Sequence, residues 1–359
     1  MSDPSTGRAA LLGAGAWTSI GRSAVASCAA ARASVARFRL GSHASVAGAE
    51  AFTTAPARCL PPVAMGEPAA LTPRLVALAR GALADAAGRL PIAASGAVTV
   101  LLGVPSPRPG LPEDAVEAVV ASIRADLEAG GLRPRIETFA LDQAAGISAL
   151  ARAVALVAER PSEPCLVGGV DSYLSAGTLA WLHGREQLKS GGNRWGFVPG
   201  EAAAFAVIAS PSLVSARGLS PAAWVLSAAT AREEVTPCGS VPLLGKGLSA
   251  ALAGALVALV GDARVDEVVC DLNGERWRGD EAGFALARAS RRFVDPGRMT
   301  APALSFGDVG AASGALWLAV AAHAGARGYA RGPRVLVWTS AEGGARAAAL
   351  LDVPSIRRE

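Results

Sequence analysis

The chain has 359 residues, enough for two packed units or one large duplicated domain. Hydrophobic residues make up 51% of it and charged residues only 18%, so a large buried core is expected. No run of 18 or more apolar residues is free of Gly, Pro and charge, which argues against a membrane span. The polar and acidic start of the sequence also lacks the features of a secretory signal.

The five cysteines are scattered, without a C-x-x-C pair or a Cys/His cluster. This pattern predicts neither disulfides nor a metal site, and it favours a reducing, cytoplasmic compartment. The net charge of +4 is modest and the arginines are dispersed, so nucleic-acid binding is not expected. A local arginine patch could still attract an acidic carrier protein.

Short apolar runs alternate along the chain with Ala-rich segments of helical periodicity. Up to residue 210, the pattern predicts strands at 9–13, 97–103, 136–141, 164–170 and 202–209, and helices at 75–90 and 147–159. Beyond it, strands are predicted at 222–229, 265–272 and 334–339, and helices at 247–260 and 314–325. This alternation predicts an α/β protein whose parallel sheet is covered on both faces. With a hinge at 210–218, it suggests a duplication into halves 1–210 and 211–359.

The first glycine cluster does not predict a cofactor. Gly13 and Gly15 begin a dinucleotide-binding pattern, but Thr18 stands at its third glycine. The acidic residue expected about 20 positions further on is also missing. A tight turn between a strand and a helix is the better interpretation.

Conventional nucleophilic catalysis also finds little support. There is no G-x-S-x-G motif, and the histidines at 43, 183 and 323 lie in a polar loop or in predicted helices. Cys165 and Cys270 lie in predicted strands, where they are expected to pack as small hydrophobic residues. Cys238 is the one loop cysteine with reactive potential, and no partner for it is evident.

Five segments nevertheless form a recognisable series: 10–21 (ALLGAGAWTSIG), 165–172 (CLVGGVDS), 196–205 (GFVPGEAAAF), 242–248 and 305–315 (SFGDVGAASGA). In this order they resemble the elongating β-ketoacyl-acyl-carrier-protein synthases of the thiolase superfamily. The resemblance spans nearly the whole chain, and the segment 196–205 is its most specific part. It implies a thiolase fold, in which two duplicated βαβ halves form a five-layer αβαβα sandwich.

The resemblance also locates the catalytic positions of the family, a Cys at a helix N-terminus and two His. The small-residue pattern after the Cys matches Gln143 onward (QAAGISA), and Gln143 lies 25 positions before Gly168, as the family spacing requires. Asn273 stands at the place of the first His and Asp308 at that of the second. The family's nucleophile and both histidines are therefore replaced.

The family's aromatic gate before a Gly-Gly turn is replaced as well, since Glu342 precedes Gly343 and Gly344 here. Together with Phe197, these residues are candidates for the pocket and its gate. Gln143, Asn273 and Asp308 could converge and hydrogen-bond to one another. We favour a polar plug in a vestigial pocket over a new active site, because an amide neither attacks a thioester nor shuttles a proton.

The resemblance implies a catalytically degenerate subunit like the chain-length factors, which pair with an active ketosynthase in polyketide or fatty-acid pathways. In this hypothesis, the strand 136–141 pairs across a heterodimer axis, the partner supplies Cys and His, and an acyl carrier protein docks on the pair. A homodimer is also possible. Two alternatives remain: a malonyl-carrier decarboxylase of the Gln-for-Cys type, which needs the two His, and a non-catalytic scaffold.

Overall fold

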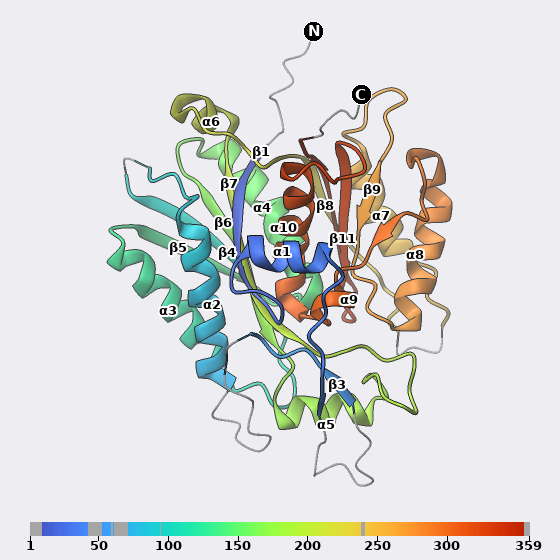
Figure 1. The fold of residues 1–359 in the computed structure, drawn as a ribbon. Helices are drawn as coiled ribbons and strands as arrows, with labels where there is room; N and C mark the ends of the chain where they lie inside the picture. Colours follow the sequence, from blue (N-terminus) through green and yellow to red (C-terminus); the bar gives the residue numbers. More distant parts are fainter. Residues whose placement is uncertain are drawn as a thin grey trace.

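The computed structural model of the chain describes residues 9–41, 52–58, 60, 71–93, 95–237 and 241–354 (Figure 1). His43, Cys59 and Cys238 lie outside these ranges. The elements up to residue 217 are β1 (Ala9–Trp17), α1 (Ala24–Arg32), β2 (Arg39–Gly41), β3 (Phe52–Thr54), α2 (Leu71–Ala87), β4 (Ala97–Gly103), α3 (Ala115–Ala129), β5 (Arg133–Phe139), η2 (Asp142–Ala144), α4 (Ala145–Glu159), β6 (Cys165–Ser172), α5 (Ala176–Gly184), β7 (Glu201–Ala209) and α6 (Pro211–Arg217). The remaining elements are β8 (Ala223–Arg232), α7 (Lys246–Leu256), β9 (Glu267–Val269), α8 (Arg276–Ala289), η3 (Ser290–Arg292), β10 (Met299–Thr300), α9 (Ala303–Phe306), η4 (Gly310–Ala312), α10 (Ser313–Ala326), β11 (Arg334–Ser340) and β12 (Ala345–Asp352).

The duplication is visible in the strand order. The main sheet has ten strands in the order β10-β9-β11-β12-β8-β1-β7-β6-β4-β5. The first half contributes β1, β4, β5, β6 and β7, and the second half contributes β8 to β12. If these strands are numbered from one to five within each half, the order from the outer edge inward is third, second, fourth, fifth and first in both. The pairing directions match as well, with the outer three strands parallel and the inner pairs antiparallel. The halves join where β1 pairs with β8.

The prediction of a wholly parallel sheet is wrong for these inner strands. β12 follows β11 through a tight turn, and the chain between β6 and β7 returns from the same end of the sheet at which β6 finished. Without a crossover helix the second strand must run antiparallel. The sequence did not indicate this, because an apolar strand buried on both faces looks the same in either direction.

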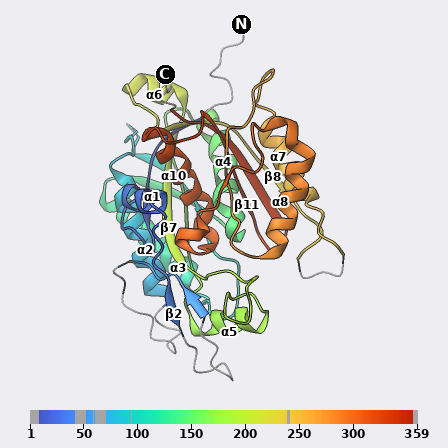
Figure 2. The same ribbon diagram turned by 45° about the vertical axis from the view of Figure 1, so that its right-hand side comes forward.

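The helices complete five layers (Figures 1 and 2). We call the strands from each half of the chain a half-sheet. α2 and α3 cover the outer face of the first half-sheet, and α7 and α8 cover the outer face of the second. α4 and α10 lie between the half-sheets, α4 packing on β6 and β8, and α10 on β7 and β11. The middle layer is Ala-rich and almost fully buried, as expected of helices that are apolar on all sides.

Two glycines let the middle helices meet at their N-termini. A Cβ on Gly146 of α4 would lie 2.6 Å from the backbone nitrogen of Ala315, and one on Gly314 of α10 would lie 2.7 Å from that of Ile147. Only residues without a side chain allow this approach. It places the residues just before α4 and α10 side by side.

The segment 210–218 contains a short helix, α6. Ser210 caps it by accepting a hydrogen bond from the Leu213 nitrogen, and Gly218 ends it in the left-handed conformation. The division of the chain at residue 210 stays a prediction. In the described part of the chain, no helix has the length and apolarity needed to cross a membrane.

Candidate functional site

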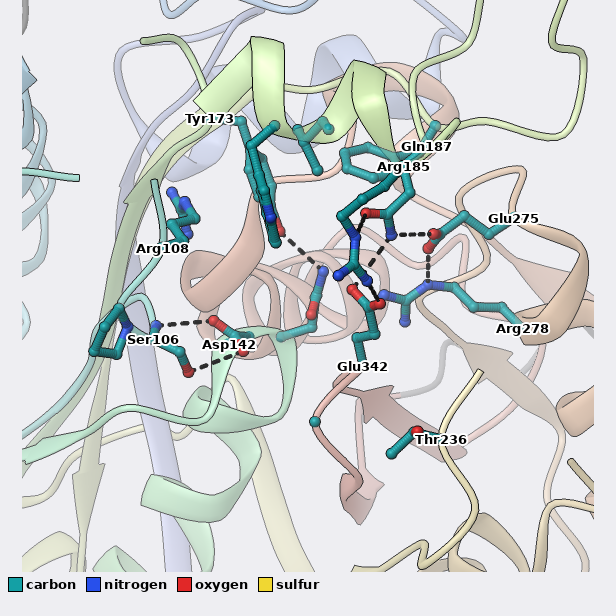
Figure 3. Close-up of a pocket in the computed structure, with 16 residues that line it drawn as sticks. Ser106, Arg108, Asp142, Tyr173, Arg185, Gln187, Thr236, Glu275, Arg278 and Glu342 are labelled. Atoms are coloured by element: carbon teal, nitrogen blue, oxygen red, sulfur yellow. Dashed lines mark hydrogen bonds and ion pairs between the residues drawn. The ribbon is translucent and has the colours of Figure 1, made fainter. Parts of the chain in front are cut away.

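A pocket of about 340 Å³ opens beside the N-terminus of α4 (Figure 3). It is lined by Ser106, Pro107, Arg108, Asp142, Gln143, Tyr173, Trp181, Leu182, Arg185, Gln187, Phe197, Thr236, Glu275, Arg278, Glu342 and Gly343. Both halves of the chain contribute residues to the lining of the pocket, and most of the lining side chains are polar or charged. We call this pocket the inner chamber.

Gln143 sits in the η2 turn that leads into α4 and is only 6% exposed. The residue before it, Asp142, has a φ of +46°, a left-handed conformation that turns the chain sharply into the helix. The Gln143 Nε2 donates to the Tyr173 hydroxyl at 3.1 Å and to both carboxylate oxygens of Asp308 at 3.1 Å. The side chain is thereby fixed by partners from both halves.

Asp308 is the centre of this cluster. It lies between Gly307 and Gly310, both with positive φ, just before η4 and α10. Its carboxylate accepts from the Asn273 Nδ2 at 2.7 Å and from the Gly310 nitrogen at 2.9 Å, besides Gln143. These donors satisfy the buried carboxylate.

Asn273 follows β9 in a turn in which Gly274 has a φ of +113°. Its Nδ2 donates to Glu275 Oε2 at 3.0 Å as well as to Asp308, and its Oδ1 accepts from the Glu275 nitrogen at 3.0 Å. The structure therefore brings together the three positions at which the sequence departs from the synthase pattern. They form one hydrogen-bonded cluster at the junction of the halves.

A buried arginine supports this cluster and was not predicted. Arg278 on α8 donates to Asp271 Oδ2 at 2.7 Å, to Glu275 Oε2 at 3.0 Å and to the Ser340 carbonyl at 2.6 Å. Its guanidinium is also 3.9 Å from the Asp308 carboxylate. Burial raises the pKa of Asp271 to about 6, although Arg278 acts in the opposite direction. Arg278 lies in the charged run ERWRGD, whose composition is typical of a solvated helix face.

The sequence also did not predict the side of the inner chamber that lies across from Arg278. The loop VPSPRPG at 104–110 forms this side, and it has no helical or strand periodicity. The Arg108 side chain is buried, pairs with Asp171 at 2.5 Å and lies 4.6 Å above the Tyr173 ring. Asp142 accepts from both the nitrogen and the hydroxyl of Ser106 at 2.9 Å, and burial raises its pKa. Burial also raises the pKa of Tyr173 well above its ordinary value, so its hydroxyl stays protonated.

The predicted gate residues lie in different places. Glu342, in the turn between β11 and β12, forms an ion pair with Arg185 at the edge of the inner chamber (Figure 3). Gly343 and Phe197 also line the chamber, and the Phe197 ring packs 5.4 Å from that of Tyr173. Gly344 is not part of the lining; its φ of +97° closes the turn.

The pocket offers hydrogen-bonding groups, among them the carboxyl groups of Asp142, Glu275 and Glu342. Among the described residues its lining contains no Cys and no His, so these residues offer neither a thiolate nor an imidazole. Cys28, Cys165 and Cys270 are buried elsewhere, and burial raises the pKa of each to about 12. Among the described residues, no three His, Cys, Asp or Glu side chains are grouped to hold a metal ion.

No protein-family model and no curated protein matches the sequence. Solved structures do match along nearly the whole chain. A chain of the AntDE:AntF complex, a type II polyketide acyl-carrier protein with its ketosynthase, matches with a TM-score of 0.77 at 13% identity over 96% of this chain and 99% of that one. A chain of the complex between the ketosynthase ApeO and its chain length factor ApeC, from Xenorhabdus doucetiae, matches with a TM-score of 0.76 at 15% identity, over 98% of this chain and 100% of that one.

The ishigamide ketosynthase/chain length factor matches with a TM-score of 0.70 at 21% identity, over 97% of this chain and 99% of that one. Together with the repeated strand order, these matches confirm the predicted fold class. The chain has the thiolase fold of the ketosynthases and chain length factors. At these identities the likeness concerns the fold, and the inner chamber has to be interpreted from its own residues.

Proposed function

We propose that this protein is a non-catalytic synthase-like subunit that pairs with an active ketosynthase and helps to shape its acyl-chain tunnel. The observation that carries the proposal is the position of Gln143 and the hydrogen bonds that its side chain makes. Gln143 occupies the N-terminus of α4, where the fold would present a nucleophile, and its amide is bonded to Asp308 and Tyr173. An amide in this position fills the site and supplies no electron pair for attack on a thioester.

The partners of Gln143 support the same interpretation. Asp308 and Asn273 take the places at which the resemblance expects histidines, and each is bonded to the other. A decarboxylase would need donors aimed at the enolate oxygen that develops on the substrate. Here the Nδ2 of Asn273 is directed to Asp308 and Glu275 instead, which makes the decarboxylase alternative the weaker one.

The free edge of the sheet provides a surface for the partner. β5 is an outer strand, paired on one side with β4. Its odd-numbered residues direct their backbone groups to β4, as the bonds of the Arg133 nitrogen and the Phe139 carbonyl indicate. The backbone groups of Ile136 and Thr138 therefore point outward, available to a strand of another subunit. The chain runs from this strand directly to Gln143.

Co-expression with a ketosynthase of the same genome that retains its Cys and His residues tests the pairing. We expect a one-to-one complex in size-exclusion chromatography with light scattering. Thr138→Pro should weaken it, because the variant loses an outward N–H that the subunit itself does not use. Thr138→Val keeps this N–H and is the matched control. A stable homodimer that excludes every such ketosynthase would count against the proposal.

Product length separates a tunnel-shaping subunit from a passive scaffold. Leu182 lines the inner chamber and is buried, so Leu182→Ala enlarges the chamber and Leu182→Phe fills it. If the chamber belongs to the tunnel, the two variants should shift the products of the reconstituted pair in opposite directions. Unchanged products in an intact complex would favour the scaffold alternative.

A further inference from the structure

A second cavity lies against the inner chamber and shares a wall with it. This outer cleft, of about 560 Å³, is lined by Arg185, Glu186, Gln187, Trp195, Pro237, Glu275, Arg276, Trp277, Asp280 and Glu342. Four side chains line both cavities: Arg185, Gln187, Glu275 and Glu342. They therefore form the partition between the two, and we call these four residues the polar strap.

The strap is a chain of polar contacts across this boundary (Figure 3). Arg185 forms an ion pair with Glu342, and its Nε donates to Gln187 Oε1 at 2.8 Å. The Gln187 Nε2 then donates to Glu342 Oε2 at 3.3 Å and to Glu275 Oε1 at 3.2 Å. Each member is thus bonded to at least one other.

The strap separates the inner chamber from the more exposed outer cleft. On its inner side, Leu182 and Phe197 are buried. On its outer side, Trp195 is 60% exposed and the Arg276 side chain 75%. A molecule that enters the inner chamber from the outer cleft must therefore pass the strap.

The two sides of the strap differ in how firmly they are held. Glu275 is buried and bonded to Arg278, which also fixes the start of the turn that carries Glu342. Arg185 and Gln187 follow α5 and belong to the other half of the chain. The Arg185–Glu342 pair is about one-third exposed on each side, and such a pair is weak and screened by salt.

We propose that the polar strap is a gate, with Arg185 and Gln187 as its moving side and Glu275 and Glu342 as its fixed side. Opening breaks the contacts to Glu342 and Glu275 and joins the outer cleft and the inner chamber into one site. The chamber behind the gate combines hydrogen-bonding side chains with the apolar surfaces of Leu182 and Phe197. The gate does not depend on the proposed function. Only the identity of the molecule that the joined site would hold during synthesis rests on it.

Substituted cysteines report whether the gate controls access. Gln143→Cys places a thiol at the base of the inner chamber, and Ser106→Cys places one on its wall with little change in volume. Each is combined with Arg185→Ala plus Gln187→Ala, or with Arg276→Ala. Arg276 lines only the outer cleft and pairs with Asp280 at 3.6 Å, which makes it the matched control. Iodoacetamide labelling of each cysteine is followed over time by peptide mass spectrometry on the isolated protein.

We expect Arg185→Ala plus Gln187→Ala to speed labelling of both reporters by about fivefold or more, the change that a modest shift in the open population gives. Arg276→Ala should leave the rates unchanged, and added salt should speed labelling only where the strap is intact. Equal rates with and without the strap, for both reporters in folded protein, would overturn the gate. Because no ketosynthase takes part, this outcome is separate from failure of the proposed pairing.

Discussion

Among the single residues of the Gln143 cluster, Asp308 is the one on which the hydrogen bonds of the cluster depend. It is the shared acceptor for Gln143, Asn273 and the Gly310 nitrogen, and it lies near Arg278. Replacing it leaves the buried Gly310 nitrogen without its acceptor, takes one acceptor each from Gln143 and Asn273, and removes a carboxylate 3.9 Å from the buried Arg278. The cost of such a change is set by the unpaired groups that remain rather than by the bonds that are lost.

We therefore predict that Asp308→Ala lowers the free energy of unfolding by about 3 kcal/mol. Asp280→Ala is the control, since Asp280 is exposed and its pair with Arg276 should contribute less than about 0.5 kcal/mol. Urea unfolding followed by circular dichroism measures both. If the two variants unfolded at the same urea concentration, the cluster would not be the buried network described above.

The buried cysteines allow a second test at this scale. Burial raises the pKa of Cys28, Cys165 and Cys270 to about 12, so at mildly alkaline pH almost none of each thiol is ionised. We predict that iodoacetamide labels these three only after the protein is unfolded, as peptide mass spectrometry would show. Rapid labelling of any of them in folded protein would reveal a reactive thiol and weaken the non-catalytic interpretation.

The elements that position the site depend on the contact between α4 and α10. A Cβ at Gly146 would meet backbone atoms of Gly314 and Ala315 at 2.6–2.9 Å, and backbone cannot move aside as a flexible side chain can. Gly283 of α8 is the matched position, because a Cβ there would meet nothing within 4 Å.

We predict that Gly146→Ala destabilises the protein by roughly 1–3 kcal/mol through overpacking. Gly283→Ala should stabilise it by up to about 1 kcal/mol, because Ala is the better helix former. Thermal unfolding of both variants provides the comparison. A neutral Gly146→Ala would mean that the two helices can separate, and that the junction carrying Gln143 and Asp308 is looser than described.

Sequence predicted these elements unevenly. The buried β4, β6 and β7 and the helices α4 and α10 were found within a few residues, because continuous apolar runs and helical periodicity mark them clearly. β5 begins three residues before its prediction, since its first three residues are two exposed arginines with a Pro between them, which do not resemble a buried apolar run. The spacing from Gln143 to Gly168 was informative for the same reason, because it spans α4 and ends in β6, and both elements are well marked and largely buried.

The supporting side chains of the site could not be found in this way. Arg185 meets Glu342 across 157 positions of the chain, and Arg108 meets Asp171 across 63. Such pairs depend on how segments far apart in the chain pack together, and no local period encodes this. A charged residue in a polar run also looks the same whether it is buried and paired, like Arg278, or solvated.

At the scale of the whole molecule, the duplicated strand order leaves two outer strands, β5 and β10. β10 has only two residues, and so short an edge offers little for pairing. β5 has seven, and Pro134 removes one N–H from it. The longer edge lies next to Gln143, which is where a catalytic partner would have to sit to use this subunit's chamber.

Reconstitution with a disabled partner tests the central claim most directly. The protein is co-expressed with its ketosynthase, either intact or with the nucleophilic Cys replaced by Ala, and chain extension on acyl carrier protein is measured by mass spectrometry. We predict extension by the intact pair and none by the pair that lacks the partner's Cys, because the proposed function assigns the nucleophile to the partner. Extension by the disabled pair, or by this protein alone, would contradict the account.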